Sequence, residues 1–431
     1  MRNSDNVLER PTRVAFVTQW FPPEPAAIPL GLARALRNQG LDVGVLTGVP
    51  NYPTGRVTPG YSAWRRSSET RDGFPIRRTP LYPSHDQSAL RRATNYLSYA
   101  ASSTLLGGPM LRSADVALVY SSPATAATAA IAARRRWGLP YVLMVMDLWP
   151  DSIFSTGFFD PGRGRRIAEG TLHWFTDRTY RLAAHVTVTC PGMREVLIAR
   201  GVPPEKVSVI YNWADEKLMQ PTEPDPRLRA ELGLTDGFVV MYGGNVGAAQ
   251  GLDVAVRAMA KLRDLPDVHL VLVGEGIERP VLRSLVDKLE LRTVHFVDRV
   301  APDRMAAFMA AADLQLVSLA DEPLFQITMP SKVQSIMACG QPLLVCAPGD
   351  AARVVEDASA GFTTPPGDPA ALARVIRHAR GVPRPDLIAM GRNGRNHYLR
   401  VMSEEINSLR LAGLLAAAAQ HGVRVGTGRH R

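Results

Sequence analysis

The stretch Pro330-Ser331-Lys332-Val333-Gln334-Ser335-Ile336-Met337-Ala338-Cys339-Gly340 lies between two apolar runs in the second half of the chain. Pro330 suits a helix start, since the N–H it lacks would be unpaired there, and Gly340 suits a helix end. Lys332 then falls in the first turn, which the unpaired N–H groups already make positive. A phosphate-bearing ligand would compensate, because backbone N–H groups and an ammonium converge on the same oxygens. The alternative is a lysine that simply extends into water.

The order of elements around this stretch predicts an α/β architecture. In the second half, we expect strands at 238–242, 270–273, 295–297, 314–319 and 343–346, with helices at 251–262, 280–289 and 306–312. The first half opens strand, helix, strand over 14–18, 28–38 and 41–47, and further strands are expected at 116–120, 141–146 and 186–189. Such alternation is typical of doubly wound parallel sheets. We therefore expect two Rossmann-like domains facing a central cleft.

The length of the chain supports two domains. A chain of 431 residues exceeds what one hydrophobic core usually serves. We assign 1–205 to an N-terminal domain and 206–395 to a C-terminal domain. A helix at 396–415 is expected to cross back to the first domain, and 416–431 to form a basic tail.

The charge of the chain is concentrated in its first half. Residues 1–200 hold 24 arginines, no lysine and 14 acidic residues, so the whole net charge of +10 lies there. Part of it falls in a poorly periodic stretch at 65–78. A basic half indicates an anionic partner such as a membrane or a phosphorylated acceptor, unless it reflects genome composition. No recognised motif points to nucleic acid.

A helix predicted at 89–106 suits two environments. Arg91 and Arg92 stand at its start, and Tyr96 and Tyr99 add aromatic rings with polar tips. This composition is compatible with a lipid headgroup boundary and with a core helix that has two solvated arginines.

Cysteine usage and hydropathy favour a cytoplasmic chain. Cys190, Cys339 and Cys346 follow no metal-ligand spacing and cannot all pair, which fits reduced, buried thiols. Residues 1–11 lack the apolar segment of a secretory signal. No apolar run reaches the length of a membrane span, so any membrane contact is expected to be peripheral.

Two loops that follow predicted strands carry candidate functional residues. Gly243-Gly244-Asn245-Val246-Gly247 lets a ligand approach the backbone, and its N–H groups favour phosphate, although a tight structural turn is the alternative. Asp147 stands just past the strand at 141–146, where α/β sheets present functional groups. Catalysis and capping of the next turn both suit it. Gly-x-Gly-x-x-Gly is missing after the first strand, so no dinucleotide cofactor is expected.

Five short motifs carry a family resemblance. They are Gln19-Trp20-Phe21-Pro22-Pro23-Glu24, Pro50-Asn51-Tyr52-Pro53-Thr54-Gly55, Asp147-Leu148-Trp149-Pro150-Asp151-Ser152, Gly244 to Leu252, and 330–340. Together they resemble the retaining GT-B glycosyltransferases of the family-4 group. Within it they are similar to the bacterial capsule, O-antigen and exopolysaccharide subgroup that transfers amino sugars. The resemblance implies an acceptor-binding first domain and a second domain that holds a nucleotide-sugar donor, with UDP preferred.

The resemblance also implies where the donor binds. The diphosphate is expected near Gly243, Gly244, Asn245, Gly247, Gln250, Pro330, Ser331 and Lys332, and the nucleoside near Glu275 and Arg299. Many family members carry Arg and Lys where this chain has Asn245 and Gln250, and this departure agrees with the subgroup. They also carry a ribose-binding Glu where Ser335 stands, which leaves the ribose contact open.

The chemistry follows from the leaving group, whose phosphate oxygen gains negative charge as the glycosidic bond breaks. No Asp-x-Asp motif is present, so we expect no metal, and protein groups should stabilise that charge. Lys332 and the helix amino ends at Gly247 and Ser331 are the candidates. Asp147 is expected to orient the acceptor hydroxyl or act as a weak base.

The acceptor is expected to be a lipid-linked or free saccharide in cell-envelope polysaccharide biosynthesis. Arg65, Arg66, Arg91 and Arg92 would then hold the enzyme at anionic lipid, each contributing about 1 kcal/mol near the surface. One alternative is a nucleotide-sugar 2-epimerase, but no cluster of His and acidic residues is evident. Another is a nucleotide-sugar-binding partner subunit that has lost activity, which Ser335 supports.

Overall fold

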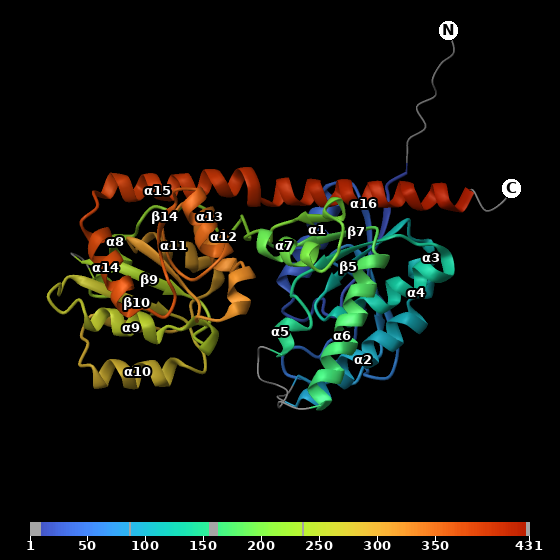
Figure 1. Ribbon diagram of the computed structural model, residues 1–431, viewed down its shortest axis with the longest axis horizontal. Helices are drawn as coiled ribbons and strands as arrows, with labels where there is room; N and C mark the ends of the chain where they lie inside the picture. The colour runs from blue at the N-terminus through green and yellow to red at the C-terminus, as the bar shows by residue number, and fades with distance from the viewer. Residues whose placement is uncertain (1–9, 86–87, 155–162, 235–236, 428–431) are drawn as a thin grey trace, which may run out of the picture. The chain divides into compact units, whose positions relative to one another are not determined.

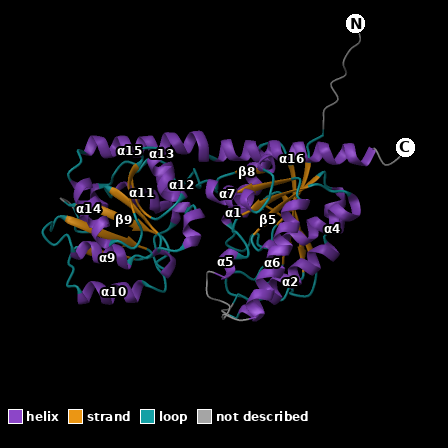
Figure 2. Cartoon of the chain, in the orientation of Figure 1, coloured by secondary structure: helices purple, strands orange, loops and turns teal. Residues whose placement is uncertain are grey.

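A computed structural model describes residues 10–85, 88–154, 163–234 and 237–427, shown in Figure 1. These residues form two compact α/β units. The first comprises the described parts of Met1–Thr189, Arg194–Ile210 and Ser408–Arg431, and the second comprises Cys190–Met193 and the described parts of Tyr211–Asn407. The second unit therefore begins at Tyr211 rather than at residue 206, and it also includes the four residues 190–193. In both units, helices surround a sheet (Figure 2).

The first unit is built on an eight-stranded sheet with the order β3-β4-β2-β1-β5-β6-β7-β8. The strands are β1 Arg13–Val17, β2 Asp42–Gly48, β3 Ser67–Arg71, β4 Phe74–Thr79, β5 Val116–Ser121, β6 Tyr141–Val145, β7 His185–Val188 and β8 Val207–Val209. Every pair is parallel except β3 with β4. Strands β5 and β6 are buried at every residue, as continuous apolar runs in a parallel sheet are.

The hairpin of β3 and β4 differs from the irregular stretch expected at 65–78. Asp72 and Gly73 form its turn with φ angles of 52° and 79°, and an Asp-Gly pair is a strong signal for such a two-residue turn. The pairing leaves Arg65 and Arg66 exposed but buries Arg78 completely. The arginines of this stretch therefore do not form one solvated group.

The helices of the first unit include α2, which lies at the predicted position. They are α1 Ala27–Asn38, α2 Ala89–Leu106, α3 Gly108–Ser113, α4 Ala127–Trp137, α5 Asp151–Phe154, α6 Arg163–Leu182 and α7 Pro191–Ala199, with short 3-10 turns at Ala124–Ala126 and Pro204–Lys206. The Tyr99 hydroxyl of α2 is buried and donates to the carbonyls of Thr18 and Leu46, at 2.9 and 3.2 Å. Tyr99 therefore faces the core, in agreement with the second of the two environments considered for this helix.

The second unit is built on a six-stranded sheet with the order β11-β10-β9-β12-β13-β14, and all its pairs are parallel. The strands are β9 Phe238–Gly243, β10 Val268–Val273, β11 Val294–Val297, β12 Leu314–Ser318, β13 Leu343–Cys346 and β14 Gly361–Thr364. Apolar residues of β9, β10, β12 and β13 pack with α9 and α14 into one core.

The helices of the second unit follow its strands in turn. They are α8 Pro226–Glu231, α9 Asp253–Ala260, α10 Arg279–Lys288, α11 Met305–Ala310, α12 Ser331–Ala338, α13 Asp350–Asp357, α14 Pro369–Arg380 and α15 Arg384–His397, with 3-10 turns at Ala248–Gln250, Pro302–Arg304 and Pro323–Ile327. The quoted stretch is thus the helix α12 with Pro330 as its N-cap. No described helix is long and apolar enough to cross a membrane.

The end of the chain differs from the single helix expected at 396–415. A π-helical turn, Tyr398–Met402, follows α15, and α16 then runs Glu404–Thr427. Ser403 separates them, and the Asn407 side chain donates to the carbonyls of Val401 and Ser403 at 2.9 and 3.0 Å. Residues up to 427 of the expected tail are therefore helical, because local side-chain contacts restart the helix at Glu404.

Candidate functional site

Lys332, in the first turn of α12, is a partly buried cation. Its ammonium lies 4.7 Å from the centroid of the Tyr242 ring at the end of β9. Desolvation lowers the pKa of Lys332 to about 8. Among the described residues no carboxylate pairs with it, although a cation enclosed in this way is costly unless it is compensated. An anionic ligand would supply that compensation.

Gly244 lets this lysine reach the backbone of the loop that follows β9. Its φ is 139°, and a Cβ at this position would lie 2.5 Å from Lys332 Cε. Gly274, at the end of β10, has a φ of 136°, and a Cβ there would lie 2.0 Å from the Gly244 carbonyl oxygen. Only glycine fits at both positions. The loops after β9 and β10 are therefore pressed together beside the Lys332 ammonium.

The Gln250 side chain accepts a hydrogen bond from one of the backbone N–H groups that we expected to contact phosphate. The Gly247 N–H donates to Gln250 Oε1 at 3.0 Å, and Asn245 Nδ2 approaches the same oxygen at 3.5 Å. The helix expected from 251 begins only at Asp253, after a 3-10 turn. Without a ligand, Gly247 is thus engaged within its own loop. Gly243, the last residue of β9, and Asn245 lie in the same loop as Gly244.

Ser331 and Ser335 lie on successive turns of α12. The Ser335 hydroxyl donates to the Ser331 carbonyl at 3.1 Å, a local bond that many helical serines make. Pro330 is extended, with φ −63° and ψ 132°, and leads the chain into the first turn. The first-turn residue Lys332 is thus brought to the loop after β9, and Ser335 lies about one turn further along.

Of the two residues expected at the nucleoside, Glu275 belongs to an ion-pair cluster around an unpredicted arginine, and Arg299 does not. Arg279, only 7% exposed, pairs with Glu275 and, at 2.6 Å, with Asp298. Glu275 and Arg279 are four residues apart, a spacing that favours such pairs and could have predicted this one. Arg299 is exposed after β11. Arg279, rather than Arg299, is therefore the arginine that this cluster holds.

A cavity of about 770 Å³ lies within the first unit. It opens beside the loops that follow β1, β2, β5 and β6, and residues of α1, α2 and α6 complete its wall. The lining residues are largely apolar and aromatic: Trp20, Pro25, Ala26, Ala27, Ile28, Pro29, Tyr52, His85, Arg92, Ala93, Tyr96, Leu97, Tyr120, Ser122, Pro123, Thr125, Asp147, Trp149, Ser152 and Leu172. Such a composition is typical of small-molecule sites.

Five rings form a continuous chain along this cavity. Neighbouring ring centroids are 4.7 Å apart for His85 and Tyr52, 5.4 Å for Tyr52 and Trp20, 6.4 Å for Trp20 and Tyr96, and 5.8 Å for Tyr96 and Trp149. These separations are ordinary for interacting rings. The sequence analysis did not predict this row of rings, although Trp20, Tyr52 and Trp149 belong to the motifs quoted there.

Asp147 is the carboxylate of this cavity. It follows β6, as predicted, and its exposed side chain lines the cavity. Burial raises the pKa of Asp147, and the Ser122 hydroxyl, which donates to Oδ2 at 3.3 Å, partly offsets this. A carboxylate with a raised pKa beside an apolar cavity suits it to orient a hydroxyl group or to accept its proton.

Both units match known domain families. Residues 25–213 match the Glycosyl transferase 4-like domain, and residues 237–379 match Glycosyl transferases group 1. The chain belongs to the GT-B glycosyltransferases. The sequence-based prediction of a glycosyltransferase is thereby confirmed.

This glycosyltransferase has relatives that match most of its length. It is 26% identical over 324 residues to the putative colanic acid biosynthesis glycosyl transferase WcaI of Escherichia coli (strain K12), covering 72% of this chain and 77% of WcaI. It is also 26% identical over 363 residues to the D-inositol 3-phosphate glycosyltransferase of Acidothermus cellulolyticus, covering 80% of this chain and 75% of that enzyme.

Solved structures confirm the fold class. Anabaena Alr3699/HepE in complex with UDP and glucose superposes with a TM-score of 0.66 and 20% identity, covering 94% of this chain and 99% of that chain. The lipopolysaccharide glycosyltransferase WaaG superposes with a TM-score of 0.62 and 17% identity, with the same coverage. At these identities the likeness shows the fold alone, which is two α/β domains with parallel sheets.

Proposed function

We propose that this glycosyltransferase moves an N-acetylamino sugar from a UDP-linked donor to a lipid-linked saccharide, with retention of configuration and without a metal. The pathway we propose is the synthesis of a cell-envelope polysaccharide. The observation that carries the donor half is the partly buried Lys332 ammonium at the start of α12, which has no carboxylate partner among the described residues. WcaI, which is named as a putative colanic acid biosynthesis glycosyl transferase, supports the pathway class.

The donor diphosphate is the anion that fits the second unit. Lys332 and the N–H groups that begin α12 would meet its oxygens, and Gly244 allows the phosphate to approach the backbone. As the bond to the sugar breaks, negative charge grows on the leaving phosphate, and fixed cations and dipoles stabilise it without reorganising. Asn245 would add a neutral hydrogen bond. Glu275 would lie toward the nucleoside.

The acceptor fits the first unit. The cavity presents aromatic faces to a sugar or a hydrocarbon, and Asp147 is exposed to it. In our proposal Asp147 orients the attacking hydroxyl, while the leaving phosphate takes its proton. Ser122, which donates to the Asp147 carboxylate, would keep that carboxylate in place.

The donor half is tested by nucleotide binding. We expect UDP to raise the melting temperature and to bind in calorimetry, and GDP and ADP to bind much more weakly. UDP at about 100 times its Kd would stabilise the protein by about 2.7 kcal/mol. Uridine is the matched control, because it lacks the diphosphate that Lys332 would contact.

Three outcomes of this titration are informative. If no nucleoside diphosphate binds, the donor assignment is wrong. If UDP binds but UDP-N-acetylglucosamine is not hydrolysed even slowly, the inactive partner subunit becomes the better reading. Equal binding of uridine and UDP would contradict a diphosphate site at Lys332.

Exposed apolar side chains beside the cavity support a lipid-linked acceptor. On α2, Leu90, Leu97 and Leu105 are 77%, 61% and 80% exposed, and on α6, Ile167 and Trp174 are 71% and 60% exposed. Each set repeats at seven or eight residues and so lies on one face of its helix. Leu97 of α2 and Leu172 of α6 line the same cavity. In our proposal this face, with Arg91 and Arg92, contacts anionic lipid.

Vesicle binding tests this membrane face. We expect the wild type to sediment with vesicles that contain phosphatidylglycerol, and the double variant Leu90→Glu, Ile167→Glu to partition on the order of tenfold less, because two apolar contacts become charged. Ile388→Glu on α15, where the side chain is 45% exposed, is the matched control. Equal sedimentation of all three proteins, or no effect of anionic lipid, would count against a membrane face.

A further inference from the structure

Two rings of the cavity wall stand on loops rather than on helices or strands. Trp20 lies in the loop between β1 and α1, and Tyr52 lies in the loop after β2. Their ring centroids are 5.4 Å apart. Because loops alone do not hold two rings in a defined relation, other groups must fasten them.

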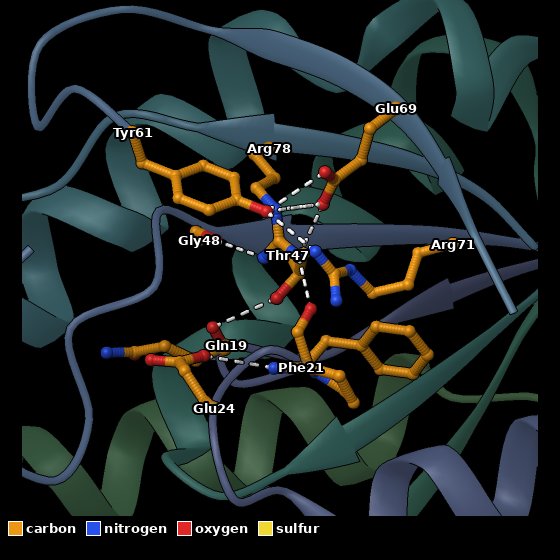
Figure 3. Close-up of polar contacts among 10 residues, drawn as sticks. Gln19, Phe21, Glu24, Thr47, Gly48, Tyr61, Glu69, Arg71 and Arg78 are labelled. Atoms are coloured by element: carbon orange, nitrogen blue, oxygen red, sulfur yellow. Dashed lines mark hydrogen bonds and ion pairs between the residues drawn. The ribbon is translucent and has the colours of Figure 1, made fainter. Parts of the chain in front are cut away.

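Glu24 joins the two loops through its carboxylate, and Figure 3 shows its bond to Phe21. One oxygen accepts the N–H of Phe21 at 3.1 Å, and the other accepts the N–H groups of Asn51 and Tyr52, both at 2.8 Å. The side chain is only 4% exposed. It therefore bonds to the residue after Trp20 in one loop and to Tyr52 itself in the other.

Arg78 of β4 donates hydrogen bonds to backbone carbonyl groups at the same two loops, as Figure 3 shows. Its guanidinium is fully buried, donates to the Gly48 carbonyl at 3.2 Å and also donates to the Pro22 carbonyl. Glu69 of β3 balances its charge at 2.7 Å, and the Tyr61 ring lies 5.0 Å away. The planar guanidinium can serve these acceptors together because its donors point in fixed directions.

We propose that Glu24 and Arg78 are positioning residues of the acceptor site, which hold Trp20 and Tyr52 in register and so decide which acceptors the cavity takes. This inference rests on the proposed function only in assigning the acceptor to the cavity. Neither Glu24 nor Arg78 lines the cavity, so the proposed reaction gives neither residue a direct role. Glu24 nevertheless belongs to one of the motifs that carry the family resemblance.

A carboxylate is the side chain that this position needs. It offers acceptors on both oxygens, whereas glutamine would turn an amide N–H₂ toward one of the three backbone N–H groups. Leaving a buried N–H unpaired is unfavourable, so the loop would shift to satisfy it. Displacements of about 1 Å at such a site cost on the order of a hundredfold in reaction rate.

The experiment uses the full-length protein labelled with 5-fluorotryptophan, with the Trp20 resonance assigned through Trp20→Phe. We expect Glu24→Gln to shift or split the ¹⁹F resonance of Trp20. Asp115→Asn is the matched control, because Asp115 accepts hydrogen bonds from Arg10 and from the Arg13 backbone outside the cavity wall. Glu24→Asp, which keeps the charge but is shorter, should give a smaller change and replaces Glu24→Gln if that variant does not fold. An unchanged Trp20 resonance would overturn the proposal.

Affinity for a defined probe completes the test. The probe is farnesyl diphosphate-linked N-acetylglucosamine, and we expect Glu24→Gln to weaken its binding by about tenfold to a hundredfold while UDP binding stays within twofold. Equal probe affinity in wild type and variant would overturn the positioning role. If the wild type does not bind the probe although the Trp20 resonance responds to Glu24→Gln, the acceptor assignment fails while the fastening of the loops stands.

Discussion

Replacing Lys332 by methionine is expected to lower the turnover of UDP-N-acetylglucosamine by about 10²- to 10³-fold, as loss of one oxyanion donor does in other enzymes. Methionine keeps an apolar stem against the Tyr242 ring but removes the cation that lies 4.7 Å from it. UDP affinity should fall as well, because the diphosphate loses its charged partner. Steady-state release of UDP and calorimetry measure the two effects.

Lys288→Met is the control for this substitution. Lys288 ends α10 and is exposed, so its loss should change neither turnover nor UDP affinity. A Lys332→Met protein that binds UDP as the wild type does would contradict the donor site that we assign to α12.

The pKa of Lys332 predicts how the affinity for UDP depends on pH. Burial lowers this pKa from 10.5 to about 8, so UDP affinity should decrease as the pH rises through about 8. Between pH 8 and 10.5 the unfolded chain holds the proton that the folded chain has lost, so this group makes the free protein more stable as the pH rises. Lys332→Met does not bury a charge, so it should be more stable than the wild type at pH 7. Between pH 8 and 10.5 this difference in stability should shrink, as pH-dependent melting would show.

Replacing Asp147 by asparagine is expected to lower kcat by about 10²-fold, the cost of misplacing a reacting group by about 1 Å. UDP affinity should not change, because Asp147 lies in the first unit and Lys332 in the second. Burial raises the pKa of Asp147, so wild-type activity should rise with pH through a value above the ordinary range of aspartate. The variant should lack that limb of the profile.

Asp151→Asn is the matched control for Asp147→Asn. Asp151 lies four residues further along and pairs with Arg200 at 2.7 Å. Its loss should leave kcat within a few-fold of the wild type. If Asp147→Asn were as active as Asp151→Asn, Asp147 would have only the structural role that its sequence position also allows.

The sequence by itself determined the order of most elements and the loops and helices on which several candidate site residues lie. Apolar runs at 116–120 and 141–146 predict buried strands, and the structure has strands at Val116–Ser121 and Tyr141–Val145, because hydrophobic patterning is a local property of the chain. The glycines at 243–247 and the Pro330 to Gly340 stretch were placed correctly for the same reason. Turn and cap chemistry depends on a few adjacent residues. Even the missed hairpin carries a local signal in Asp72-Gly73.

Only the tertiary structure decided which side chains meet. Glu24 and Tyr52 lie 28 residues apart in the chain, and Gln19 and Asn95 lie 76 apart, yet each pair is joined by a hydrogen bond. The burial of Arg78, the inward direction of Tyr99 and the chain of rings likewise depend on how distant segments pack. Spacing along a sequence reports which face of one element a residue lies on, but not which other element covers that face. That choice is made by packing of the whole domain, and it turned two loops with ordinary turn residues into the wall of a cavity.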